Sequence, residues 1–164
     1  MNEYALQLIE RHQRSGVLVD TNLLLLYFVG SFRKDLIARF KRTEVFTVED
    51  FDLLVRLLGL FTKVVTTPNI LTETSNLAGQ LRSDLKEGLF GVFAAGINIL
   101  EECHIPSAEA AKSQEFVRFG LTDAVMANLA RENYLILTAE YRLSQYLQSL
   151  GIDVINFNHL RDWS

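Results

Sequence analysis

The chain has 164 residues, 49% of them hydrophobic, which is enough to bury the core of one domain. Its most apolar stretch, residues 17–29, is interrupted by Asp20 and Asn22, so it falls short of the roughly 18 uninterrupted apolar residues of a membrane span. The net charge of −4 argues against a protein that coats nucleic acid non-specifically, but it leaves room for a local basic strip.

The N-terminal stretch and the cysteine content bear on the cellular compartment. The first residues, MNEYALQLIERHQR, contain two acids and no apolar segment, so we expect no signal peptide. A single cysteine, Cys103, excludes an internal disulfide framework and fits a reducing compartment. We therefore expect a cytoplasmic protein that does not enter a membrane.

The first third of the chain alternates between helical and strand patterns. Residues 2–13 have apolar side chains at helical spacing and predict an amphipathic helix. The segment GVLVD predicts a short strand, buried on both faces if it is parallel and central. Helical spacing follows from Asn22 to about Gly30. Residues 33–42 predict a further helix, with apolar side chains on one side and basic residues around them.

The middle of the chain continues this alternation. Residues 47–61 predict a helix, because Thr47 and the acids after it suit a helix N-terminus. KVVTT predicts the second strand, and Pro68 suits the first turn of a helix that ends near Gly79. Residues 81–100 predict another, looser helix.

The last third repeats the pattern. A helix is predicted to open between Gly120 and Thr122, followed by the strand YLILTA, a helix that ends at Gly151 and the strand IDVINF. Strands separated by helices imply parallel pairing and right-handed crossovers. The sequence therefore predicts a layered α/β sandwich.

Four carboxylates stand at the predicted strand ends and helix starts. Asp20 ends the first strand, and Glu140 directly follows YLILTA. Glu73 and Asp123 lie in the first turns of two helices. Because ligand sites of parallel sheets lie at the carboxyl ends of the strands, we expect these four side chains to share one pocket. Taken singly, each has an ordinary explanation, such as a helix cap, a first-turn charge, a solvated helix face or an exposed turn.

Such a cluster needs a counter-charge. Two carboxylates about 4 Å apart repel by roughly 4 kcal/mol at an effective dielectric constant near 20. Oxygen ligands select a hard cation, Mg²⁺ or Mn²⁺. Zinc is disfavoured, because Cys103 and His104 are adjacent, and the other two histidines lie near the chain ends in no ligand-like spacing.

Four segments, VLVDTNLLL, TTPNILTETSNL, GLTDAVMANLA and ILTAEYRLSQYLQSLGIDVINF, resemble the PIN-domain family of metal-dependent ribonucleases. The stand-alone members most similar in style are VapC-type toxins. The resemblance runs from residue 16 to 158. It implies a three-layer α/β/α sandwich with a central parallel sheet, formed by one domain over residues 1–164, with an N-terminal helix in residues 1–15.

The resemblance also implies roles for the acids. Asp20 and Asp123 would be direct metal ligands, and Glu73 would bind the metal or a metal-bound water. The fourth acid is usually Asp in the family, and here Glu140 would complete a second site or the outer shell. Two further residues match polar positions that support the family's site: Asn22 and Thr138.

By the same resemblance the activity would be phosphodiester hydrolysis of RNA, and the partner could be a protein antitoxin. Apolar helices such as residues 48–61 could form a homodimer face. The RNA backbone could meet the densest basic cluster, although a solvated helix face is the slightly favoured explanation of these charges. The cluster consists of Arg33, Lys34, Arg39, Lys41 and Arg42. The segment 82–118 is longer than a compact toxin needs.

Two other interpretations compete. The chain could be a catalytically degenerate PIN scaffold that binds a partner, because Glu140 is one methylene longer than Asp and Mg²⁺ demands near-ideal octahedral geometry. A phospho-receiver pocket is disfavoured, since it needs a lysine after a late strand and paired acids near the start of the chain.

Overall fold

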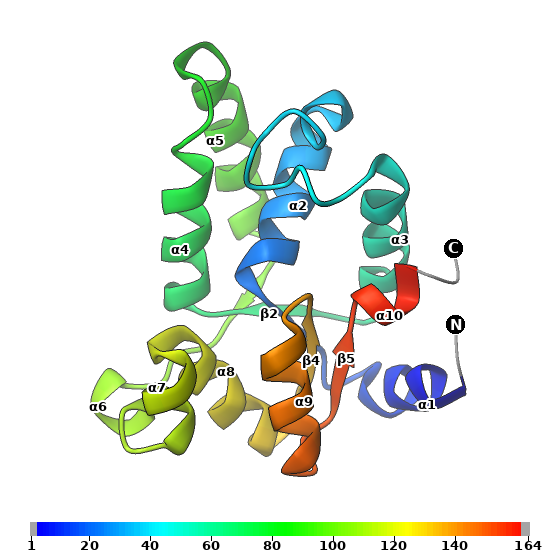
Figure 1. Ribbon diagram of the computed structural model, residues 1–164, viewed down its shortest axis with the longest axis vertical. Helices are drawn as coiled ribbons and strands as arrows, with labels where there is room; N and C mark the ends of the chain where they lie inside the picture. Colours follow the sequence, from blue (N-terminus) through cyan, green and yellow to red (C-terminus); the bar gives the residue numbers. More distant parts are fainter. Residues whose placement is uncertain (1–2, 162–164) are drawn as a thin grey trace.

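The computed structural model describes residues 3–161, in which five parallel strands form one sheet flanked by helices. The strands are β1 (Val17–Val19), β2 (Val64–Thr66), β3 (Glu101–Glu102), β4 (Leu135–Thr138) and β5 (Val154–Asn156). In Figure 1, helices α2 to α5 gather above the strands and α6 to α9 below them. The predicted three-layer α/β/α sandwich with a central parallel sheet is confirmed. The predicted domain also includes residues 1–2 and 162–164, and the predicted N-terminal helix includes residues 1–2; these residues lie outside the described ones.

The strand order β3-β2-β1-β4-β5 places β1 at the centre of the sheet. Val17 pairs with Val64 on one side and with Leu135 on the other. From β1 the chain builds outward through β2 and β3, then returns to the other side of β1 for β4 and β5. The point at which the order reverses therefore lies between β1 and β4, and ligand crevices form at such points.

The core follows from the apolar runs. All three residues of β1 are fully buried, as expected for a central parallel strand covered on both faces. In α2 (Thr21–Phe32), Leu23 to Leu26 are also buried, so the most apolar stretch of the sequence lies in the protein core. Within residues 3–161, none of the helices combines the length and apolarity that crossing a bilayer requires.

Most of the predicted helices form near their predicted ends. They are α1 (Glu3–His12), α2, α3 (Val48–Leu58), α4 (Pro68–Ala78), α5 (Ser83–Ile97), α8 (Leu121–Glu132) and α9 (Tyr141–Ser149). Local signals explain their starts. Thr47 and Asp50 form a reciprocal capping box at α3, and Thr67 caps α4 ahead of Pro68.

The helix predicted over residues 33–42 is wrong. Only the short 3₁₀ helix η1 (Lys34–Leu36) forms, followed by turns, although the apolar side chains of the segment are buried as expected. The buried Thr43 accounts for the difference. Its hydroxyl donates to the carbonyl of Ile37 at 2.8 Å, and its amide bonds back only three residues to Phe40. These local bonds favour tight turns over a continuous α-helix.

The sequence also missed several short elements, three of them between residues 100 and 120. The segment after α5 contains β3 and two short helices, α6 (Ser107–Ala110) and α7 (Gln114–Phe119), and α10 (Asn158–Arg161) follows β5. Strand β3 consists of two exposed glutamates at the sheet edge, so no apolar pattern marks it.

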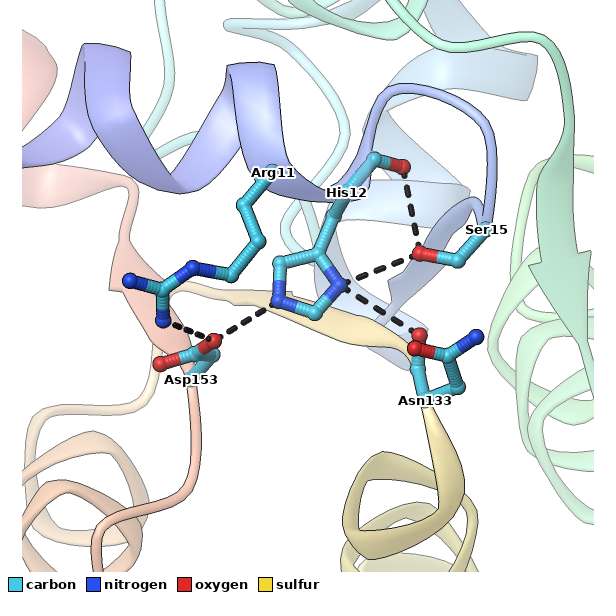
Figure 2. A network of polar contacts seen from close by, with 5 residues as sticks. All are labelled: Arg11, His12, Ser15, Asn133 and Asp153. Atoms are coloured by element: carbon cyan, nitrogen blue, oxygen red, sulfur yellow. Dashed lines mark hydrogen bonds and ion pairs between the residues drawn. The ribbon is translucent and has the colours of Figure 1, made fainter.

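A polar network fastens α1 to the amino edge of the sheet (Figure 2). The ring of the buried His12 lies 2.7 Å through Nε2 from a carboxylate oxygen of Asp153, which also accepts from Arg11. Its Nδ1 lies 3.1 Å from the hydroxyl of Ser15 and 3.3 Å from the carbonyl of Asn133. A carbonyl oxygen can only accept, so this geometry suits an Nδ1–H donor, which would not take a proton from Ser15. The trio of serine, histidine and aspartate therefore joins α1 to the starts of β4 and β5 and is not arranged as a catalytic triad.

Replacing Asp153 by Ala should lower the free energy of unfolding by about 2 kcal/mol at pH 7, because it leaves Nε2 of the buried His12 ring without its partner. Burial raises the pKa of the Asp153 carboxyl, but hydrogen bonds from His12 and Arg11 outweigh this and hold the pKa below its usual value. The stabilisation by the Asp153 carboxylate is therefore present above about pH 4 and is lost as the pH falls through the lowered pKa. Urea unfolding at pH 7 and pH 3 measures it. Arg11→Ala, which removes an exposed partner, should cost less than about 1 kcal/mol; an equal loss in both variants would contradict this role of His12.

Candidate acidic pocket

A pocket of about 350 Å³ opens at the carboxyl ends of β1 and β4, where the strand order reverses. All four predicted acids line it, although they come from four separate segments of the chain. The lining residues are Asp20, Thr21, Asn22, Glu73, Arg118, Phe119, Asp123, Glu140, Arg142 and Leu143. The expectation that the carboxylates share one edge of the sheet is confirmed.

Asp20 is the most rigidly held of the four. It follows β1 and caps α2 by accepting the amide of Leu23 at 2.8 Å. Its other oxygen accepts the hydroxyl of Thr138 at 2.6 Å and the amide of Ala139 at 2.8 Å. Burial raises the pKa of the Asp20 carboxyl, the hydrogen bonds oppose this, and the charge of Glu140 raises it further. Asp20 is thus both a helix cap and a wall of the pocket, and Thr138 fixes its orientation.

Glu73 and Glu140 are more exposed, and hydroxyl or amide groups hold them. One oxygen of Glu73 accepts the hydroxyl of Thr21 at 3.1 Å, and the other accepts that of Thr122. Glu140 accepts the side-chain amide of Asn22 at 3.1 Å. The two polar residues predicted to support the site, Asn22 and Thr138, therefore each contact one of its acids. Thr21 and Thr122 were not predicted.

Asp123 lies in the first turn of α8, as predicted, just after Gly120 with its positive φ of 92°. Burial, and then the charges of Asp20, Glu73 and Glu140, raise the pKa of the Asp123 carboxyl to about 7. Within residues 3–161 no side chain or amide donates a hydrogen bond to this carboxylate. The repulsion expected between the four acids is therefore concentrated on Asp123.

The acids suit a hard cation by their chemistry rather than by a ready-made geometry. Within residues 3–161, no three Cys, His, Asp or Glu side chains are arranged as a metal site. Instead, the carboxylate of Glu73 accepts hydrogen bonds from the hydroxyls of Thr21 and Thr122, and that of Glu140 accepts one from the side-chain amide of Asn22. All four groups offer oxygen ligands in one pocket, which suits Mg²⁺ or Mn²⁺.

The predicted basic cluster does not reach this pocket. It follows the C-terminal end of α2, whereas Asp20 stands at the N-terminal end, and the 12 residues between span about 18 Å. Arg33 and Arg39 pair with Asp35, and Lys34 pairs with Asp52. Exposed ion pairs of this kind are typical of a solvated surface, which the sequence left open as the alternative.

Sequence reasoning missed the pocket's positive charges. Arg118 comes from α7 and Arg142 from the first turn of α9, and Phe119 and Leu143 accompany them. Arg142 stands two residues after Glu140, so its place near the site could have been inferred. The helix that carries Arg118 had no signal in the sequence.

Comparison with models of known protein families and with curated proteins finds no match to this chain. The resemblance to PIN domains therefore stays a prediction from motifs. The functional argument rests on the residues of the pocket.

Proposed function

We propose that the protein is a metal-dependent ribonuclease that hydrolyses phosphodiester bonds of RNA. The observation that carries this proposal is the meeting of four carboxylates in one pocket, where burial and the other three acids raise the pKa of Asp123 to about 7. Such a site favours a divalent cation, and a cation favours a phosphate ligand. RNA is proposed as the substrate because the order of the motifs resembles that of PIN-domain ribonucleases.

Each acid has a distinct task in this proposal. Asp20 and Asp123 would hold Mg²⁺ or Mn²⁺ directly, and Glu73 would bind the ion or one of its waters. Glu140 would complete a second site or the outer shell. The bound ion would lower the pKa of a water and neutralise charge on the phosphate. Thr138 keeps Asp20 in place, and Asn22 orients Glu140.

The biological setting is part of the proposal. A ribonuclease of this kind would act on RNA in the cytoplasm as the toxin of a toxin–antitoxin pair, silenced by a protein antitoxin. A second copy of the chain could pack on α3, where Val55 is exposed and Leu60 follows just beyond the helix end. Analytical ultracentrifugation would measure that association.

A binding module on a degenerate scaffold is the second candidate. It is favoured by Glu140 in place of the family's Asp, and by the side chains of the acids, which within residues 3–161 form no ready-made metal site. A binding module should cleave no RNA with any divalent ion.

The test is cleavage of a mixed RNA pool with Mg²⁺, Mn²⁺ or EDTA. We expect cleavage with Mn²⁺ at least as fast as with Mg²⁺, because Mn²⁺ should tolerate imperfect geometry better. EDTA should stop the reaction. Asp123→Asn, which removes a proposed ligand at constant shape, should reduce the rate about 100-fold or more. A wild-type protein no faster than this variant with every metal would leave the binding module as the function.

The fourth acid can be tested separately. Glu140→Asp should keep or improve the cleavage rate, since it restores the usual residue and its charge. Glu140→Gln should lower the rate about tenfold, because it removes the charge at constant shape. Initial rates with Mn²⁺ measure both. If Glu140→Gln cleaves as fast as the wild type, the protein can still be a nuclease, but Glu140 does not serve its site.

A further inference from the structure

Two arginines line the acidic pocket without a carboxylate partner. Arg118 lies in the last turn of α7 and Arg142 in the first turn of α9, and both are exposed. Within residues 3–161, no ion pair joins either of them to an acid. This sets them apart from Arg33 and Lys34 of the predicted basic cluster, whose charges are already paired.

The side chain of Arg118 is held over an aromatic ring. Its guanidinium carbon lies 4.9 Å from the ring centroid of Tyr146, a residue of α9. Phe119 packs on the same ring at a centroid distance of 5.3 Å. A cation–π contact of this kind places a guanidinium without neutralising its charge. The arginine is therefore positioned and still free to bind an anion.

The wall that carries Arg118 is itself anchored. Glu115 of α7 is 1% exposed, and its carboxylate pairs with Arg131 of α8 at 2.7 Å. Together with the contact to Tyr146, this ties α7 to both α8 and α9. The segment 82–118, which is longer than a compact toxin needs, therefore ends in α7, and α7 is held beside the pocket.

The charges of the pocket explain what these arginines could bind. A nucleic acid strand that reaches four carboxylates meets repulsion at its phosphates, and the protein as a whole carries a net charge of −4. Guanidinium groups pair with phosphate oxygens through two parallel hydrogen bonds. Arg118 and Arg142 supply this pairing at the pocket itself, which the cluster from residue 33 to 42 does not reach.

We propose that Arg118 and Arg142 bind the phosphates that flank the scissile phosphate of the RNA strand, and so position the strand in the acidic pocket. This inference rests on the proposed ribonuclease function. Both act as positioning residues, with no part in the chemical step. The basic cluster after α2 contributes little to RNA binding on this account.

The experiment measures RNA binding separately from cleavage. A fluorescent mixed-sequence RNA oligonucleotide is titrated with the non-cleaving Asp123→Asn protein, alone and with Arg118→Ala, Arg142→Ala or Arg39→Ala added. We expect each pocket substitution to raise Kd about fivefold to tenfold, and to lower the slope of log K against log salt by about 0.7. Arg39→Ala, an exposed control, should change Kd less than about twofold. Arg118→Lys should recover part of the affinity, which separates lost charge from a displaced α7.

The outcomes distinguish this inference from the function on which it rests. Unchanged Kd and salt slope in both pocket variants would overturn the inference. A shift in the half-saturating Mn²⁺ concentration without a change in RNA affinity would also overturn it, because the arginines would then act as counter-charges of the acids. If Arg118→Ala and Arg142→Ala proteins cleave RNA with the KM of the wild type, the ribonuclease function stands and the inference is overturned. If the protein binds RNA through both arginines but cleaves none, the arginines still bind phosphate, but the ribonuclease function and the place of the arginines beside a scissile phosphate are refuted.

Discussion

Asp123→Asn should raise the stability of the metal-free protein while it reduces the rate of RNA cleavage about 100-fold or more. Burial and three neighbouring acids raise the pKa of the Asp123 carboxyl to about 7, and within residues 3–161 no donor offsets this. Removing the charge at constant shape should therefore raise the free energy of unfolding by about 3 kcal/mol at pH 8. A core or capping aspartate would respond in the opposite direction.

The pH dependence of this gain follows from the sign of the shift. The folded-state pKa of about 7 lies above the usual 3.8, so between these values the folded protein binds more protons than the unfolded chain. Stability of the wild type therefore falls as the pH rises through this window, and the full penalty is present above about pH 7. Urea unfolding in EDTA from pH 4.5 to 8 should show the two proteins converging at the acid end. A constant difference across this range would show that Asp123 is not the titrating group.

Asp20→Asn should do the reverse. The Asp20 carboxylate accepts from the amides of Leu23 and Ala139 and from the hydroxyl of Thr138. An asparagine can still cap α2 with its oxygen, but its NH₂ group would then face two donors. Burial also raises the pKa of the Asp20 carboxyl, so removing its charge gives some relief, but the buried donors left unpaired outweigh it. We expect a net loss of about 2 kcal/mol in the free energy of unfolding. Two neighbouring aspartates of one pocket thus change stability in opposite directions.

The same substitution should remove the response to metal. At about 100 times its dissociation constant, Mn²⁺ or Mg²⁺ should stabilise the wild type by about 2.7 kcal/mol. The gain should nearly vanish in Asp20→Asn, which lacks a proposed ligand. Thermal unfolding with increasing Mn²⁺ measures this, and Asp153→Asn, at the opposite edge of the sheet, is the matched control with a full response. An undiminished response in Asp20→Asn would remove Asp20 from the ligand set.

The main lines of the fold, and the acids of the site, could be predicted because their signals are local. Asp20 directly follows a fully apolar strand, and Asp123 follows the glycine that opens a helix, so each is placed by a pattern a few residues long. Parallel pairing then brings the strand ends to one edge without further information. The positions of the acids needed only the alternation of strands and helices.

What could not be predicted depends on contacts across the chain. The turns after α2 form because the hydroxyl of Thr43 takes carbonyls that a helix would use, which spacing does not reveal. Arg118 reaches the pocket because two contacts hold α7 there. Glu115 pairs with Arg131 of α8, and Arg118 itself lies over the ring of Tyr146 of α9. Strand β3 has two exposed glutamates and no apolar period. In each case tertiary contacts decide the structure.

The measurement that tests the central claim most directly is a parallel Mn²⁺ titration of RNA cleavage and of thermal stability in the same buffer. If the four carboxylates hold the ion that supports hydrolysis, the cleavage rate and the rise in Tm should share one half-saturating concentration, and both should shift together in Glu73→Gln. RNA cleavage that persists in EDTA, or that saturates at a Mn²⁺ concentration where the Tm does not move, would contradict a metal-dependent nuclease site in this pocket.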